Sequence, residues 1–115
     1  MQPKSLKLLE DIREAATFIR DATQKSTIEL YRQDKLLRFA VERNFEIIGE
    51  AIKRLATTDQ QTAGQIGDYQ QIIAFRNVLI HGYDLVDHVL VWSTVKNQVP
   101  KLLIDVQALL KSKSN

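Results

Sequence analysis

The stretch DKLLRFAVERNFEIIGEAIKRLA, residues 34–56, decides the fold class of this chain. Its apolar residues recur at steps of three and four, which is the period of one face of an α-helix. Asp34 suits the helix N-cap, because its carboxylate can accept a hydrogen bond from the first turn. The predicted buried stripe contains Leu37, Val41, Phe45, Ile48, Ile52 and Leu55, widened by Leu36, Ala40, Ile47 and Ala51. A stripe this wide predicts a long helix that packs on two sides.

The sequence before residue 34 predicts two more helices. The first covers residues 4–22 and has an apolar stripe formed by Leu6, Leu9, Ile12, Ala16 and Ile19. Ser26 and Glu29 have the spacing of a capping box. They predict the start of a short helix that includes Leu30 and Tyr31.

The sequence after residue 56 predicts a loop and two further helices. Residues 57–67, TTDQQTAGQIG, are polar and contain two glycines, which is typical of a loop. Asp68 is predicted to cap a helix that ends at Gly82, and Asp87 to cap the last helix. The last helix has a coiled-coil-like seam of Trp92, Val95, Val99, Leu102, Val106 and Leu109. Pro100 should kink or split this helix, because proline lacks a backbone N–H.

These elements predict one all-α domain over residues 1–115, an antiparallel bundle of four main helices with one extra short helix. Helical domains of this size often gain stability by dimerising, so we expect a homodimer. No apolar run approaches the roughly 18 residues of a membrane span, and the N-terminus becomes charged too early for a signal peptide. We therefore expect a cytoplasmic protein without a membrane partner.

Composition argues against several kinds of chemistry. The chain has no cysteine, which excludes disulfides, zinc–thiolate sites and thiol nucleophiles. His88 is predicted to lie on the surface beside Asp87, since metal ligation would need companions that the sequence does not supply. Glu46 and Glu50 are expected to be solvated or to form salt bridges, with Arg43, Lys53 and Arg54 as candidate partners. We expect no metal and no cofactor, and a net charge of +2 is too small to indicate nucleic-acid binding by itself.

Residues 72–81, IIAFRNVLIH, combine a nearly continuous apolar surface with strongly polar residues. A helix that is apolar almost all round is predicted to be buried on several sides. Arg76, Asn77 and His81 nevertheless lie within it. Because burying an unpaired guanidinium is costly, Arg76 needs a partner or must open into a cleft. A local conflict of this kind indicates a functional site.

Helix geometry separates two of these polar residues. At about 100° per residue, Arg76 and His81 lie roughly 140° apart around one helix and do not share a face. Asn77 and His81 are four residues apart and do share one, so the Asn77 amide is expected to orient the imidazole or a bound phosphate. His81 is expected at the helix C-terminus, where the helix dipole favours its protonated form.

The stretch RNVLIHGY, Arg76 to Tyr83, resembles the Arg-x4-His-x-Tyr motif of HepT-like HEPN proteins. The residue after the arginine is commonly polar in that family, and Asn77 matches. The segment Arg43 to Leu55 resembles the family's long second main helix with its Gly-Glu-Ala step, and Val86 to Val95 resembles the opening of its last helix. The chain from Leu6 to about Leu110 aligns with the family in order and without large gaps.

The resemblance implies a helical homodimer in which the Arg-x4-His motifs meet in a cleft between protomers. Many members of the family are metal-independent endoribonucleases that act as toxins, encoded beside a nucleotidyltransferase antitoxin of the MNT type in type VII toxin–antitoxin pairs. The implied substrate is RNA, with tRNA as one candidate. Neutralisation in the family involves adenylylation (AMPylation) of the motif tyrosine, which corresponds to Tyr83 here.

The residue types fit that chemistry. RNA carries its own nucleophile, the 2′-OH, so cleavage without a metal needs a base, an acid and a cation. His81 is the candidate general acid or base, Arg76 the candidate phosphate-binding cation and Asn77 the supporting residue. One chain supplies a single motif histidine, and two proton transfers therefore favour a dimer in which diverging residues converge across the two-fold axis.

The same residues fit two other functions. A non-catalytic HEPN module would use the basic cleft to bind a nucleotide or RNA, or would act as an antitoxin-like partner of the nucleotidyltransferase. A plain dimerisation adaptor would hold Arg76 in a buried salt bridge, and it predicts that a conservative change of Arg76 unfolds the protein.

Overall fold

The structure is a computed structural model that describes residues 2–113. Its elements are α1 (Pro3–Thr23), α2 (Ile28–Gln33), α3 (Lys35–Thr58), α4 (Gln60–Ala63), α5 (Tyr69–His81), the 3₁₀ turn η1 (Tyr83–Leu85), α6 (His88–Asn97) and α7 (Val99–Lys113). No strand occurs in this described part, and the predicted all-α class is confirmed. Within the same residues, no helix combines the length and apolarity that crossing a membrane requires.

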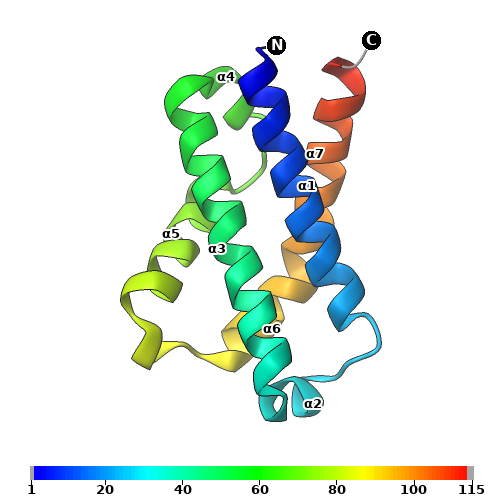
Figure 1. The fold of residues 1–115 in the computed structure, drawn as a ribbon, viewed down its shortest axis with the longest axis vertical. Helices are drawn as coiled ribbons and strands as arrows, with labels where there is room; N and C mark the ends of the chain where they lie inside the picture. Colours follow the sequence, from blue (N-terminus) through cyan, green and yellow to red (C-terminus); the bar gives the residue numbers. More distant parts are fainter. Residues whose placement is uncertain (1, 114–115) are drawn as a thin grey trace.

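The long helices run along one axis of a molecule that measures 43 × 29 × 19 Å. The first helix, α1, lies between α3 and α7 and packs along both of them (Figure 1). α5 leans on the other side of α3, away from α7, and α2 meets α6 at the end of the molecule opposite the two termini (Figure 1). α3 is therefore the helix that joins the core to the segment carrying the Arg-x4-His motif.

The core is built from the stripes that the apolar periodicity predicts, except that Leu36, which was predicted to widen the stripe of α3, is 84% exposed. On α3 the buried members are Val41, Phe45, Ile48, Ile52 and Leu55, while Leu37 is half-buried. The stripe of α1 and the seam of the last two helices are buried as well, except that Leu6 and Trp92 are half-buried. Full burial of one such aliphatic side chain stabilises a fold by about 1.5–3 kcal/mol. Packing of α1, α3, α6 and α7 thus supplies most of the apolar stabilisation.

Several predicted helix ends are confirmed. The Asp34 carboxylate accepts a hydrogen bond from the Leu37 N–H at 3.0 Å and caps α3. The Asp87 carboxylate accepts from the N–H of Val89 and of Leu90 and caps α6. The predicted split at Pro100 is also found, because the last helical stretch divides at Gln98 into α6 and α7.

Other helix ends differ from the prediction. Thr27, not Ser26, is the N-cap of α2, because the Thr27 hydroxyl accepts from the Leu30 N–H at 3.2 Å. The predicted loop over residues 57–67 contains the one-turn helix α4, whose N-cap is Asp59. Asp68 precedes α5 but makes no capping hydrogen bond, since its backbone is left-handed with φ of 61°.

A polar cluster lies where α2, α3 and α6 meet, and it corrects the prediction for His88. The His88 ring is half-buried rather than on the surface, and its Nδ1 is buried without a hydrogen-bond partner. It packs edge-on against the fully buried Tyr31 ring, with centroids 6.5 Å apart. Burial lowers the pKa of His88 from 6.5, and the positive charges of Arg38 and Arg32 lower it further.

This burial predicts a loss of stability in mild acid. Because the pKa of His88 is lowered in the folded state, the unfolded chain binds that proton more readily. The free energy of unfolding should be highest above pH 6.5 and should fall as the pH drops through 6.5 toward the folded-state pKa. Thermal unfolding of wild type and His88→Gln across this range measures the effect, and the substitution should flatten the decline.

The comparison of these two proteins cancels the contribution of Glu42, whose pKa burial raises. His81→Gln is the control for loss of a histidine, since it removes the other histidine of the chain and keeps His88. Equal slopes for wild type and His88→Gln would contradict the assigned role of His88.

Candidate active site

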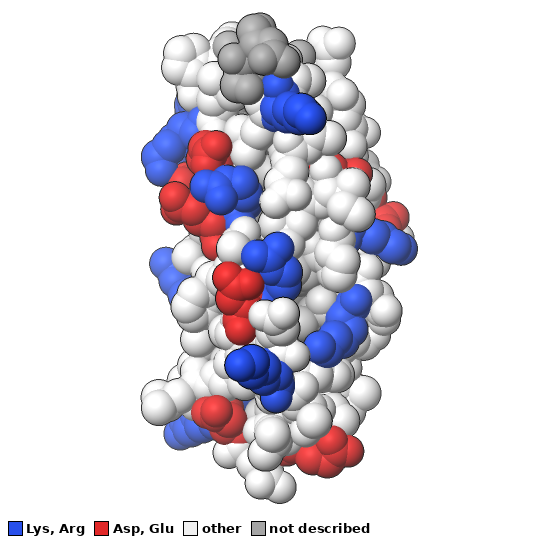
Figure 2. All heavy atoms as spheres, turned by 90° about the vertical axis from the view of Figure 1, so that its right-hand side faces the viewer, with Lys and Arg blue, Asp and Glu red and all other residues white. Residues whose placement is uncertain are grey.

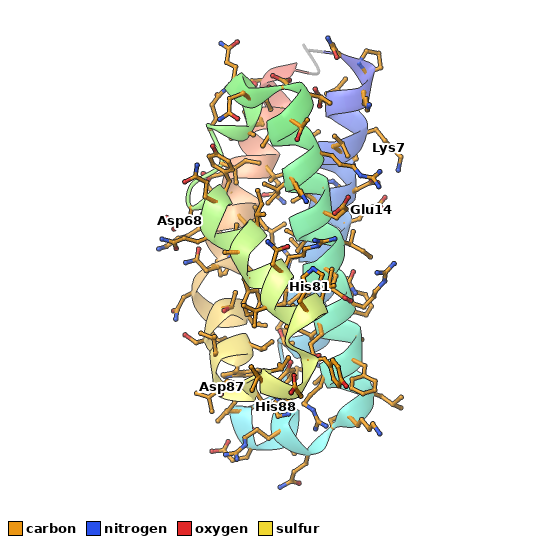
Figure 3. The ribbon with its side chains drawn as sticks, turned by 90° about the vertical axis from the view of Figure 1, so that its left-hand side faces the viewer. Lys7, Glu14, Asp68, His81, Asp87 and His88 are labelled. Carbon is orange, nitrogen blue, oxygen red and sulfur yellow. The ribbon has the colours of Figure 1, made fainter. Side chains whose placement is uncertain are left out.

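The motif from Arg76 to Tyr83 occupies the end of α5 and the start of η1. As predicted, α5 ends at its C-cap Gly82, whose N–H donates to the carbonyl of Val78 at 2.9 Å. Figure 3 views the face that carries α5 and shows His81 at the end of that helix, with His88 further along the chain, toward α2. The motif therefore spans the last turns of α5 and the change of chain direction that follows them.

α5 is less buried than its apolar surface predicts. Only Ile72 and Leu79 are buried on it, and Val78 is 47% exposed. Among the helices, α5 packs mainly on α3, where the Phe75 ring meets Phe45 edge-on with centroids 5.1 Å apart. The expectation of burial on several sides is wrong for a single chain, because one helix covers one side and leaves the other bare.

The Arg76 guanidinium has two partners within the chain. Its Nη2 forms an ion pair with Oε2 of Glu50 on α3 at 2.9 Å, and its Nη1 donates to Oδ1 of Asn77 at 3.0 Å. The Arg76 side chain is 17% exposed, and its Nε is buried without a hydrogen-bond partner. The predicted requirement for a partner is thus met. The ion-pair partner is Glu50 on α3, which the sequence pattern of α5 does not indicate.

Glu50 is shared by two arginines. Its second oxygen, Oε1, accepts from Nε of Arg54 at 3.0 Å, which confirms the predicted pairing of Glu50 with Arg54. The residue before it, Gly49, lies directly under Arg76. A Cβ at position 49 would stand 2.2 Å from Cβ and 2.6 Å from Cγ of Arg76. The missing side chain of Gly49 lets α5 approach α3 closely enough for the ion pair.

The structure places the remaining motif side chains on the outside. Asn77 was expected to orient His81 or a bound phosphate; its amide oxygen accepts from Nη1 of Arg76, and no described hydrogen bond joins it to His81. His81 is exposed, and Tyr83 is 80% exposed. The predicted divergence of Arg76 and His81 is found, since the arginine turns toward α3 and the histidine toward solvent.

A cavity of about 230 Å³ adjoins Arg76 between α1, α3 and α5. Its charged lining consists of Arg43, Arg54, Arg76, Asp11, Glu46 and Glu50, and His81 does not line it.

The face of the molecule that carries α1 and α7 shows basic and acidic side chains interspersed among uncharged ones (Figure 2). Among the described residues, no group of three His, Asp or Glu side chains is placed to hold a metal ion.

The sequence model of the family described as "Ribonuclease HepT-like" matches residues 12–109, and the chain belongs to this HepT-like family. No solved structure matched the chain.

Three relatives cover most of the chain. It is 38% identical over 94 residues to the "Probable ribonuclease HepT" of Thermococcus cleftensis, covering 82% of this chain and 84% of that protein. It is 32% identical over 99 residues to the "Putative RNase MJ1380" of Methanocaldococcus jannaschii, covering 86% and 90%. It is 29% identical over 103 residues to the "Putative RNase TTE0752" of Caldanaerobacter subterraneus, covering 90% and 91%.

The close approach at Gly49 predicts that a single methyl group destabilises the site. Gly49→Ala should lower the free energy of unfolding by about 1–3 kcal/mol, because Arg76 or the whole of α5 must shift to make room. Urea unfolding measures this. The control is Gly64→Ala, where a Cβ would make one tight contact, at 3.3 Å from the carbonyl oxygen of Gln60, and should therefore cost less than at position 49. Equal stability of Gly49→Ala and wild type would contradict the packing described here.

Proposed function

We propose that this chain is a metal-independent endoribonuclease that acts as a homodimer, with Arg76 and His81 as catalytic residues and Asn77 in support. The observation that carries the proposal is the layout of α5. This helix holds an anchored guanidinium and an exposed imidazole on a segment that one protomer covers on one side only. Membership of the HepT-like family and relatives named as ribonucleases support the same activity.

The chemistry follows from the groups at hand. A base removes the proton of the ribose 2′-OH, the oxygen attacks the adjacent phosphorus, and an acid protonates the leaving 5′ oxygen. Arg76 neutralises the charge that builds up on the phosphorane oxygens, and a guanidinium keeps its charge throughout. One His81 performs one of the two proton transfers. The His81 of a second copy supplies the other, so the site is complete only in the dimer.

Exposed apolar side chains around the motif favour a second copy as the covering partner. Besides Val78, they include Leu85, which is 76% exposed, and the ring of Tyr83. Contiguous exposed apolar surface marks interaction sites in folded proteins. Each protomer of the proposed dimer is an antiparallel four-helix HEPN bundle of α1, α3, α5 and the paired α6 and α7.

We further propose that the enzyme is a cytoplasmic toxin of a type VII pair, neutralised by an MNT-type nucleotidyltransferase. The 80% exposure of Tyr83 supports this, because its hydroxyl is open to attack the α-phosphate of ATP with release of pyrophosphate. The AMP left on Tyr83 would place a negative phosphate and a nucleoside beside His81. Both charge and bulk would then exclude RNA.

Alanine substitutions test the catalytic assignment. His81→Ala should lower the rate of RNA cleavage by about 10²–10⁴-fold, and Arg76→Ala should lower it at least as much. The assay uses purified dimer and RNA in the presence of EDTA, with circular dichroism to confirm folding. Lys53→Ala, an exposed change on α3, is the control. Wild-type rates in the alanine variants would refute the assignment, and abolition of cleavage by EDTA would refute metal independence.

The ion pair between Arg76 and Glu50 favours a second candidate, a non-catalytic HEPN module or adaptor in which Arg76 is structural. Arg76→Lys separates the two. Our proposal expects a folded dimer with reduced cleavage, because lysine keeps the charge but loses the planar fork. The adaptor expects loss of the fold, which thermal unfolding and size-exclusion chromatography would reveal.

Modification of Tyr83 is tested by mass spectrometry of the protein incubated with an MNT-type nucleotidyltransferase and ATP. We expect AMP on Tyr83, loss of RNA cleavage in proportion to modification, and no adduct on Tyr83→Phe. Tyr69→Phe is the matched control, since it removes a half-buried tyrosine at the start of α5, the helix that precedes Tyr83, and should leave the adduct intact. An adduct confined to another residue would contradict this assignment.

A further inference from the structure

We propose that Glu50 is a positioning residue for Arg76 in RNA cleavage, fixed by Arg54 and brought within reach by Gly49. The proposal rests on the ribonuclease function proposed above and deepens it. Glu50 does not touch the substrate. It determines where the guanidinium of Arg76 stands and which of its N–H groups face the phosphate.

The contacts fix the guanidinium from two directions. Glu50 on α3 accepts from Nη2, and Asn77 on α5 accepts from Nη1. Each of these nitrogens carries two hydrogens, so each keeps one N–H that neither contact uses. The Nε edge is buried. The phosphate is therefore met by the N–H groups of Nη1 and Nη2 that these two contacts leave unused, and charge-assisted hydrogen bonds of this kind are strong.

The charges at this point leave the arginine able to attract a phosphate. Glu50 alone would neutralise Arg76. Its other oxygen, however, is taken by Arg54, and the group of one carboxylate and two guanidinium ions keeps a net charge of +1. Arg54 thus holds Glu50 in place and offsets the repulsion that its charge would exert on an incoming phosphate.

Gly49 links the arrangement to the fold. Because the backbone of α3 at Gly49 passes so close to Cβ and Cγ of Arg76, the arginine starts close to the helix that carries Glu50. A short reach limits the conformations that Arg76 can adopt before RNA binds. Prearrangement of this kind acts on the transition state, and misplacement of a catalytic group by about 1 Å can cost on the order of 10²-fold in rate.

Glu46 provides a matched control. It lies on the same helix one turn before Glu50 and lines the same cavity, yet among the described residues it forms no ion pair with Arg76. If only the total charge of the cavity mattered, removing the carboxylate at position 46 or at position 50 would change RNA cleavage equally.

The experiment compares Glu50→Ala, Glu50→Gln, Arg54→Ala and Glu46→Gln in steady-state RNA cleavage. Glu50→Ala should lower kcat by about 10–10²-fold with a smaller change in KM, because Arg43, Arg54 and Arg76 all remain to attract the RNA. Glu50→Gln should recover part of kcat, since its amide oxygen still accepts from Nη2. Arg54→Ala should lower kcat less than Glu50→Ala, and Glu46→Gln should lower kcat less than Glu50→Gln does.

A spectroscopic measurement keeps the inference testable without activity. The Nε–H of Arg76 is buried in the wild type and should give an NMR signal that exchanges slowly with water. Glu50→Ala should accelerate that exchange, whereas Glu46→Gln should not. An unchanged exchange rate in Glu50→Ala would overturn the positioning role, whether or not the protein cleaves RNA. Absence of RNA cleavage by the wild type would instead count against the proposed function.

Two kinetic results would also overturn the inference. Faster cleavage or tighter RNA binding by Glu50→Ala would mean that Glu50 competes with phosphate for Arg76. Equal losses in Glu46→Gln and Glu50→Gln would mean that only the total charge of the cavity matters.

Discussion

The ion pair that crosses from α5 to α3 is the interaction on which this structure depends. Arg76 extends from a helix that is otherwise strongly apolar, and a guanidinium there is tolerated because Glu50 meets it within 2.9 Å. Gly49 makes that meeting possible by removing the side chain that would occupy the same space. The packing of α5 on α3, the ion pair of Arg76 with Glu50 and the orientation of the motif thus all depend on the contact between these two helices.

Much of the fold follows from periodicity along the chain. The stripe of α3, the seam of α6 and α7 and the caps at Asp34 and Asp87 depend on near neighbours, and local spacing predicts them. Features set by tertiary contact were missed. His88 was expected on the surface because it begins a helix beside an aspartate, but α2 folds back and brings the ring of Tyr31 against it. Asp68 has the chemistry of a cap but adopts a backbone geometry that prevents it from acting as one.

The candidate site likewise has features that local sequence predicts and features that only tertiary contact sets. The conflict between Arg76 and its apolar surroundings was visible in the sequence, and so was the divergence of Arg76 and His81. The partner of Arg76 was not, because residues 50 and 76 belong to helices whose relative placement no local pattern specifies. Asn77 was expected to orient His81 or a bound phosphate, and the contact of its amide oxygen with the neighbouring Arg76 was not predicted. The Gly-Glu pair on α3 was the one available signal, since a glycine within a helix often marks close approach of another element.

The most direct test of the proposed dimer is whether two copies meet at the face of α5 that does not pack on α3. The chain has no cysteine, so a single spin label can be placed by Val78→Cys on α5 or by Ile104→Cys on the exposed side of α7. Double electron–electron resonance then reports the distance between the two labels of a dimer. A dimer formed through α5 predicts a short distance between the labels at position 78 and a long one between the labels at position 104. A long distance at 78 with a short one at 104, or no dimer at all, would contradict it.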